Sequence, residues 1–345
     1  MELINDFATP VELTGVARAS LAEYEAAQGG LVQYLPNITS DSRVVRFSIA
    51  ATGMNEIASY RSFDAESAIG SGMGGDGAGI AELPPVSQKL RIAELDLVDS
   101  QGANAPEAKK NLAAKYAAAT TRAVADAVEV LRGQALENGK IVINDGGFHS
   151  TVDFERPTEL TATGGPLWSD SATEILAEID AHCEAFSDAN GGVEATRIIV
   201  SRKALQSLLT HPELAALVAG QNAGSNAIIP NRVSQDALNG ALAGFGLPQI
   251  DVYNRRVNKA GVMTPVLSSH KAIFVSDDTG RTVWGPTAEA NEAGYGIGAE
   301  DRPGIAVGAY KTNDPIAQWV KAAATSLPIL SNGARSMSVE ILANP

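Results

Sequence analysis

The sequence predicts an α+β protein, and three patterns carry this prediction. Residues 106–138 have the spacing of one long helix, and residues 43–50 alternate between apolar and polar side chains as in a strand. From residue 194 onward, short helical and strand patterns follow one another, which is typical of a compact mixed unit. With 345 residues, of which 45% are hydrophobic, the chain is long and apolar enough to form a globular core.

The first 42 residues predict an extension that packs against something else. A short helical pattern spans residues 20–27, and an extended stretch interrupted by Pro36 follows it. Residues 43–50 then predict a half-buried strand, and residues 88–98 predict a second one. The connection between these two strands is longer than is usual in compact domains, which favours a functional segment, a partly disordered segment or an arm that packs on another molecule.

This connection is rich in glycine. Gly70, Gly72 and Gly75 match the GxGxxG pattern that holds a dinucleotide pyrophosphate. That function needs a hydrophobic strand before the glycines and a helix after them, whereas two prolines follow here at residues 84 and 85. We therefore interpret the tract as a loop tip. A nucleotide-dependent oxidoreductase is kept as a minor alternative, which a helix directly after the tract would favour.

Residues 106–138 are the strongest helix prediction in the chain. Pro106 suits the first turn of a helix, and Gly139 is a typical C-terminal stop. At 1.5 Å per residue this helix would be about 50 Å long. Its alanine-rich stripe indicates that a sheet or another chain packs closely against it, and the stripe consists of Leu112, Tyr116, Ala119, Ala123, Ala127 and Val130 or Leu131.

The elements after this helix are read from turns, caps and periodicity. Residues 139–157 predict a hairpin with an Asp-Gly turn. Ser171 and Glu174 form a capping-box pattern at the start of a helix that places Cys183 on its core face. Further strands are expected at 196–201, 249–257, 271–277, 304–311, 315–324 and 335–342, and further helices at 203–209, 212–219 and 234–243.

The composition argues against several classes of function. Acidic residues outnumber Lys and Arg by 40 to 26, a net charge of -14, so the surface repels phosphate on average and a dedicated nucleic-acid binder is disfavoured. Cys183 is the only cysteine, which excludes an internal disulfide and indicates a reducing compartment. The sequence has neither a signal-peptide pattern nor an apolar run of membrane-spanning length, so we expect a product of the cytosol.

The chemically reactive residues do not form a known catalytic arrangement. The four histidines are not spaced as metal ligands, so we predict neither a metal nor a cofactor. His149, Ser150 and Asp153 lie close together in the sequence, but catalytic triads are assembled from distant segments and the chain lacks a GxSxG elbow. We interpret these residues as a polar turn between strands and predict that the protein is not an enzyme.

Several motifs occur in a characteristic order along the chain. The long helix contains Leu131-Arg132-Gly133 near its end, a hairpin with Val152-Asp153-Phe154 follows, and Trp168 comes next. The carboxyl-terminal part has Asp314-Pro315 and then an apolar strand at 324–330. In order and spacing, the chain from about residue 40 to its end resembles the lambda-type major capsid protein, protein E, of tailed phages.

The resemblance implies the Hong Kong 97-type phage capsid fold, with an N-terminal arm, an extended hairpin called the E-loop, a peripheral domain built on a spine helix, and an axial domain. Mapped onto this chain, it predicts the arm at 1–42, the E-loop at 43–97, the peripheral domain at 98–165 with the spine helix at 106–138, the axial domain at 166–302, and a return to the peripheral domain at 303–345.

The resemblance also implies a function. It predicts a major capsid protein that self-assembles into the hexamers and pentamers of an icosahedral phage head, which encloses double-stranded DNA without binding it specifically. The first predicted strand begins near residue 43, which leaves no room for a scaffolding domain, so we expect a separate scaffolding protein. A portal and a decoration protein are further expected partners, and a membrane is not. Assembly would take place in the host cytoplasm, and the product would be part of the virion.

The contacts between subunits are expected on two segments. On the E-loop they are Arg61, Phe63, Gly70, Gly72 and Gly75, and on the spine helix they are Lys109, Tyr116 and Arg122. A bacterial shell of the encapsulin type, which shares the fold but encloses an enzyme cargo, is the second alternative.

Overall fold

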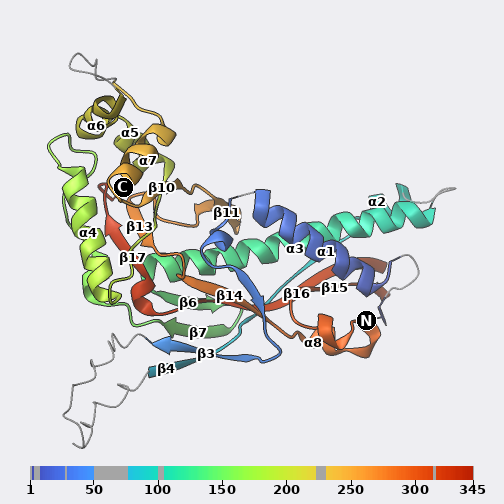
Figure 1. Cartoon of the computed structure of the whole chain (residues 1–345). Coiled ribbons are helices and arrows are strands. Elements are labelled where there is room, and N and C mark those ends of the chain that lie inside the picture. The colour runs from blue at the N-terminus through green and yellow to red at the C-terminus, as the bar shows by residue number, and fades with distance from the viewer. Residues whose placement is uncertain are drawn as a thin grey trace, which may run out of the picture.

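One long helix and two β-sheets organise the chain (Figure 1). The computed structural model describes residues 2–3, 8–27, 29–49, 77–99, 105–222, 231–313 and 316–344. The predicted spine helix is confirmed as α3 (Ala105–Asn138), and Gly139 follows it with a left-handed φ of 64°. The Arg156 guanidinium donates to the backbone carbonyls of Glu137 and Leu136, so a distant side chain caps the last turn of α3.

The buried stripe of α3 differs in part from the predicted one, of which Leu112 and Tyr116 do pack against the same core as partly buried side chains. Ala113, Ala117, Val124 and Val128 are buried against helix α1 (Pro10–Ala27) and a sheet, whereas the predicted Ala119 is exposed. The observed stripe starts one residue after Leu112, because alanines occur on every side of this helix and do not fix its orientation. Tertiary packing decides which of them face inward.

A six-stranded sheet lies along the first part of α3. Val307 and Ala309 of one strand, and Val320 and Ala322 of the next, face α1 and α3 in a common core. Residues between them in the sequence therefore face the opposite side of the sheet. The strands are β1 (Glu2–Leu3), β15 (Ala306–Asn313), β16 (Ile316–Leu330), β14 (Gly280–Gly285) and β2 (Asn37–Thr39) in spatial order, and β5 (Pro85–Arg91) also pairs with β16.

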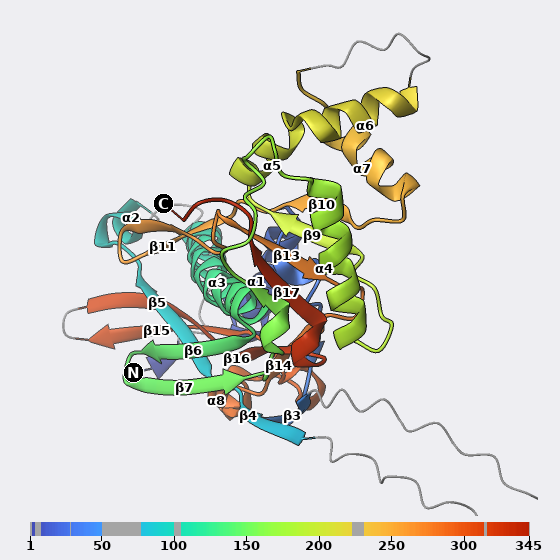
Figure 2. The same ribbon diagram turned by 90° about the vertical axis from the view of Figure 1, so that its left-hand side faces the viewer.

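A five-stranded sheet lies at the other end of α3. Ile198 and Phe274 face a core with the helices that cover the outer side, whereas Ile199 and Ile273 face the end of α3. The strands in spatial order are β10 (Gln249–Val252), β9 (Arg197–Val200), β13 (Lys271–Val275), β17 (Ser336–Glu340) and β8 (Thr161–Ala162). The covering helices, seen beside this sheet in Figure 2, are α4 (Ile175–Ala189), α5 (Arg202–Leu209), α6 (Pro212–Asn222) and α7 (Gln235–Gly244).

Three two-stranded hairpins and a few short helices complete the described structure. The predicted hairpin after α3 is confirmed as the second of the three. The hairpins are β3 (Val44–Ile49) with β4 (Gly77–Glu82), β6 (Lys140–Asp145) with β7 (Phe148–Asp153), and β11 (Arg256–Lys259) with β12 (Val262–Pro265). The short helices are α2 (Glu94–Asp99), α8 (Ala288–Asn291) and the 3₁₀ turns η1 (Leu31–Gln33), η2 (Thr158–Leu160), η3 (Ala293–Tyr295), η4 (Ala299–Asp301) and η5 (Gly333–Arg335).

The first helix begins earlier than predicted. Helix α1 starts at Pro10 and not at Ser20, and it lies on α3 and β15 of the same chain. Thr9 and Glu12 form a reciprocal capping box, in which the Glu12 carboxylate accepts from the Thr9 amide at 2.9 Å and the Thr9 hydroxyl accepts from the Glu12 amide at 3.3 Å. The bond from the Thr9 amide is the largest cause that lowers the pKa of Glu12 to about 2, and Lys110 is the next.

Two further local predictions are wrong. The strand predicted at 88–98 ends at Arg91 and gives way to helix α2. The Ser171–Glu174 capping box does not form; instead the Glu213 carboxylate accepts hydrogen bonds from the Ile175 and Leu176 amides at the start of α4. In this second case an acidic side chain from α6 supplies the cap, which local sequence does not reveal.

The two sheets combine distant parts of the chain. β14 lies within residues 166–302, yet it pairs with β16 and β2 in the six-stranded sheet. β17 lies beyond residue 302, yet it pairs with β13 in the five-stranded sheet. The chain therefore passes between the two sheets more than once, and within each sheet backbone hydrogen bonds join segments that are distant in the sequence.

Candidate assembly surfaces and the junction behind them

A buried cluster of charged side chains on α3 links this helix to α1, to the six-stranded sheet and to the segment that follows β10. The Arg132 side chain on α3 is fully buried, and its guanidinium donates to the Glu25 carboxylate of α1 at 2.7 Å and to the Glu129 carboxylate at 3.0 Å. The same guanidinium donates to the Thr282 hydroxyl of β14 at 2.9 Å and to the side-chain oxygen of Asn37. Arg132 therefore links α1, α3 and the six-stranded sheet.

The cluster continues toward the five-stranded sheet through Glu129. This carboxylate accepts from the Leu31 amide and from the Tyr253 hydroxyl, both at 2.7 Å. Burial, and then the charge of Glu129, raises the pKa of Tyr253, so the hydroxyl stays protonated as a donor. Arg255 contributes a further ion pair with Asp126 at 2.7 Å and lies 4.6 Å above the Tyr24 ring.

The sequence analysis did not identify this junction. Asp126, Glu129 and Arg132 are spaced three residues apart on α3, so they lie on one helical face, and that spacing was the available signal. Their partners come from residues 24–37 and 253–255 and from Thr282, which no local pattern connects to α3. Gly133 allows the close approach, because a Cβ there would lie 2.8 Å from the backbone oxygen of Val266.

The hairpin β3–β4 has one covered and one open face. On the covered face, the Phe47 ring packs edge-on against Phe154 with 5.3 Å between ring centroids, and it occupies the space where a side chain at Gly79 would lie. On the open face, Val44 is 41% exposed and Ile80 is 66% exposed. Two exposed aliphatic side chains on one face of a two-stranded sheet are a candidate contact surface.

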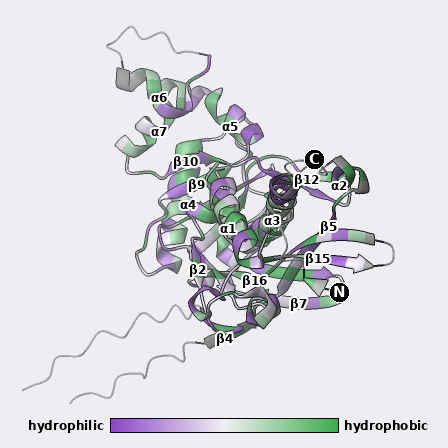
Figure 3. Cartoon of the chain, turned by 90° about the vertical axis from the view of Figure 1, so that its right-hand side faces the viewer, coloured by the Kyte–Doolittle hydropathy of each residue, from purple (hydrophilic) through white to green (hydrophobic). Residues whose placement is uncertain are grey.

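Helix α2 lies at the edge of the molecule (Figure 3), and its exposed aliphatic side chains form a second open apolar surface. Leu95 is 70% exposed and Val98 is 55% exposed, and they lie three residues apart on one helical face. Asp96 instead accepts a 2.9 Å hydrogen bond from the Tyr116 hydroxyl of α3. The polar residue thus anchors α2 to its own chain, while the two aliphatic side chains face outward.

The residues predicted to contact neighbouring subunits fall into two groups. The five on the E-loop lie outside the described residues. Of those on α3, Lys109 is half-buried, Tyr116 contacts Asp96 as described, and the exposed Arg122 guanidinium lies 5.7 Å above the Tyr24 ring. Their roles between subunits stay predictions, and Tyr116 and Arg122 have contacts within the chain.

Among the described residues, no group of three or more His, Cys, Asp or Glu side chains could hold a metal ion, and no helix is long and apolar enough to cross a bilayer. Cys183 is partly buried against the core, and burial, followed by the charges of Asp180 and Glu194, raises the pKa of its thiol to about 12. A thiol with this pKa is a poor nucleophile at neutral pH.

The nucleotide-binding alternative is not favoured. The dinucleotide interpretation requires a helix directly after the glycine tract, whereas residues 77–82 form strand β4 and residues 85–91 form strand β5. A phosphate at the end of the tract would therefore meet strand backbone in place of a helix N-terminus.

Comparison with solved structures identifies the class of fold. The chain is similar to the putative capsid protein of a prophage of E. coli CFT073, with a TM-score of 0.62, 14% sequence identity and coverage of 95% of this chain and 98% of that one. It is also similar to a phage-related protein of Bordetella bronchiseptica RB50, with a TM-score of 0.60, 17% identity and full coverage of both chains. The fold is the Hong Kong 97-type phage capsid fold, as predicted.

The sequence comparison then gives the family. A model of the phage major capsid protein E family matches residues 34–340, and the chain belongs to this family. A comparison with curated protein sequences finds no match. The protein is a phage major capsid protein that forms a shell, which confirms the predicted function at this level, and its place is in the virion capsid.

Proposed function

We propose that many copies of this protein associate into the hexamers and pentamers of an icosahedral head that encloses double-stranded DNA. The open face of the β3–β4 hairpin carries this proposal, because Val44 and Ile80 leave apolar area uncovered in a single subunit. At about 25 cal/mol per Å² of apolar area removed from water, burying such side chains on a neighbour stabilises each contact between subunits. Repetition around a ring multiplies the effect.

The segments act as the family resemblance implies. Residues 43–97 are the E-loop and residues 1–42 the N-terminal arm, of which helix α1 stays on its own subunit. Residues 98–165 with α3, together with 303–345, are the peripheral domain. Residues 166–302 are the axial domain near the centre of each ring, with β14 and β17 as the strands exchanged between the two parts.

The shell holds DNA without recognising it. The net charge of -14 repels the phosphate backbone on average, which lets the genome slide during packaging. A strongly basic inner face in the assembled shell would contradict this part of the proposal. The protein acts as a structural component and not as an enzyme, and it assembles in the host cytoplasm with a separate scaffolding protein, a portal and a decoration protein.

Electron microscopy of the expressed chain, with and without its scaffolding protein, tests the proposal. We expect closed shells with five- and six-membered rings. Replacing Ile80 by Glu should abolish shells while leaving the subunit folded, because the side chain faces away from the core. Ile80→Leu is the matched control and should assemble. Only monomers or dimers under all conditions, together with tight NAD binding, would overturn the proposal, and shells filled with an enzyme in place of DNA would favour the encapsulin alternative.

A further inference from the structure

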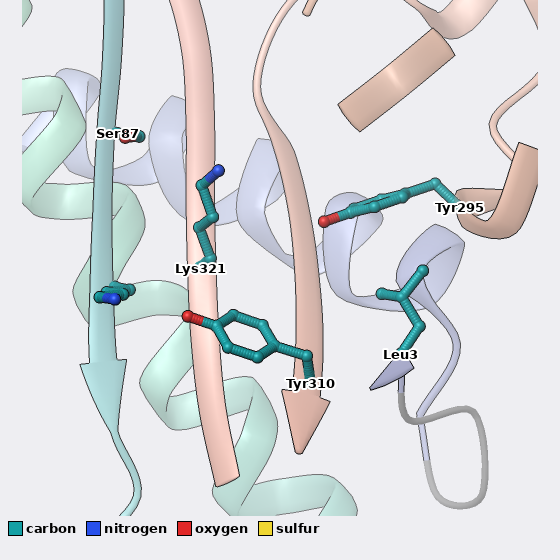
Figure 4. A pocket seen from close by; sticks show the side chains of 6 residues that line it. Leu3, Ser87, Tyr295, Tyr310 and Lys321 are labelled. Atoms are coloured by element: carbon teal, nitrogen blue, oxygen red, sulfur yellow. The ribbon is translucent and has the colours of Figure 1, made fainter. Parts of the chain in front are cut away.

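The side of the six-stranded sheet that faces away from α3 contains a pocket of about 550 Å³ (Figure 4). The strand register explains its position. Tyr310 pairs with Leu3 on one side and with Trp319 on the other, and in the next row Lys321 pairs with both Gly308 and Lys89. Residues in paired positions share a face, so one aromatic row and one lysine row lie side by side.

A glycine makes room for the second tyrosine of the pocket. Tyr295, from the 3₁₀ turn η3, lies directly over Gly308 of β15, where a Cβ would come within 2.7 Å of the tyrosine hydroxyl oxygen. Gly308 therefore forms the floor that lets a ring lie against the sheet. Figure 4 shows the Tyr295 and Tyr310 hydroxyls both directed toward the space beside Lys321.

Within the described part of the chain, these two hydroxyls are donors without a partner. Tyr295 is 9% exposed and Tyr310 is 8% exposed, and among the described residues neither hydroxyl has a hydrogen-bond partner. Burial, followed by the charge of Glu289, raises the pKa of Tyr295 to about 12, and burial raises the pKa of Tyr310. Both stay protonated near neutral pH and can donate to an acceptor that enters the pocket.

The two lysines of the pocket differ. The Lys321 ammonium is paired with the Glu289 carboxylate. The Lys89 ammonium lies 5.2 Å from the centroid of the Trp319 ring, and no carboxylate within the described part of the chain pairs with it. The pocket therefore offers one unpaired positive charge and two hydroxyl donors, beside the apolar side chain of Leu3.

We infer that this pocket receives one carboxylate side chain from a second copy of this chain, paired with Lys89 and hydrogen-bonded by the two tyrosine hydroxyls. This inference rests on the proposed function, since a shell surrounds each subunit with copies of itself. The copies have a large excess of acidic residues, 40 against 26 basic ones, which complements a locally unpaired lysine. Duplex DNA fits less well, because Glu289 and Glu292 lie near Tyr295 and repel a polyphosphate chain.

Zero-length cross-linking of assembled shells tests the inference. Shells are formed from an equal mixture of unlabelled and 15N-labelled chains, treated with a carbodiimide that joins amines to carboxylates, and digested for mass spectrometry. We expect Lys89 in a peptide pair that carries both isotope labels, joined to an Asp or Glu of this chain. The Lys321–Glu289 pair within one chain is the internal control for the reaction.

The outcomes separate the two proposals. If mixed-label pairs form at other lysines, while Lys89 is joined only within its own chain, to another protein or to nothing, this inference is overturned. The proposed function is then unaffected, because the shells have formed. If the chain forms no shells at all, the proposed function fails and this inference fails with it.

Two conservative variants give an independent readout. Tyr310→Phe removes only the hydroxyl, and Lys89→Gln removes only the charge, so each should raise the concentration needed for half-assembly by about tenfold. Lys259→Gln, which changes an exposed lysine on β11, is the matched control and should assemble normally. The unassembled variants should melt like the original chain. An unchanged assembly midpoint in both pocket variants would contradict the inference.

Discussion

The two halves of helix α3 meet different environments. Its C-terminal half, from Val124 onward, lies between both sheets and contains the fully buried Glu129 and Arg132. Its N-terminal half is covered by α1 and the six-stranded sheet along one stripe only, and it leaves Lys115 and Ala119 exposed. A helical segment that is enclosed on all sides belongs to the interior of the subunit, whereas a segment that is covered on one side only has a face available to other molecules.

The difference shows how one element serves both folding and assembly. In the enclosed half, buried charges are tolerated because each has hydrogen-bonded partners, and removing one partner leaves another charge buried alone. Beside the open half, the aliphatic side chains of the neighbouring helix α2 are exposed in the single subunit and could be covered by another molecule. Substitutions in the enclosed half should therefore change stability, and those beside the open half should change assembly.

The largest effect is expected from Arg132→Met. The substitution leaves the Glu25 and Glu129 carboxylates buried without their cation, which should lower the free energy of unfolding by about 3–5 kcal/mol. Urea unfolding of the unassembled chain measures this change. Arg122→Met, about three helical turns closer to the open half and exposed, is the control and should cost less than about 1 kcal/mol. Equal small losses in both variants would show that the junction is not critical to stability.

A smaller effect is expected from Gly133→Ala in the same half. The new Cβ would lie 2.7 Å from a methyl group of Val266 and 2.8 Å from its backbone oxygen, so the segment crossing α3 must shift. Such overpacking costs about 1–3 kcal/mol, against a gain of about 1 kcal/mol from replacing a helical glycine. We expect a net loss in urea unfolding experiments.

Gly240→Ala provides the matched control for that variant. Gly240 also lies inside a helix, α7, but a Cβ there meets nothing within 4 Å. Only the gain from helix propensity remains, so this variant should be stabilised by up to about 1 kcal/mol. If the two glycine variants changed stability in the same direction, close packing at Gly133 would not be the cause.

The elements that sequence patterns predicted well are those with strong local signals. Helix α3 has a start at Pro106 and a stop at Gly139, and hairpin β6–β7 has an Asp-Gly turn between alternating strands. Thr9, Pro10 and Glu12 are also typical of a helix start, and α1 begins there. The apolar pattern of its first half is weak, so the periodicity predicted only the second half.

The elements that were missed depend on contacts between distant residues. Residues 94–97 alternate like a strand, yet they belong to helix α2, which the contact of Asp96 with Tyr116 anchors to α3. The charged junction needs Glu25, Arg132 and Tyr253 together, and the pocket needs Tyr295 placed over Gly308. Neither follows from periodicity, because sheet register and helix orientation are set by the whole fold.

The smallest effect on stability is expected from Leu95→Glu beside the open half of α3. The side chain is 70% exposed, so replacing it should change the free energy of unfolding by less than about 0.5 kcal/mol. In a shell, however, a charge at this position would have to be desolvated against a neighbour, which opposes association. We expect normal urea unfolding together with a strongly reduced yield of shells in electron micrographs, and Leu95→Met should restore the yield. A Leu95→Glu chain that assembles fully would place α2 outside the contacts between subunits. The surface beside the open half of α3 would then face solvent in the shell as well.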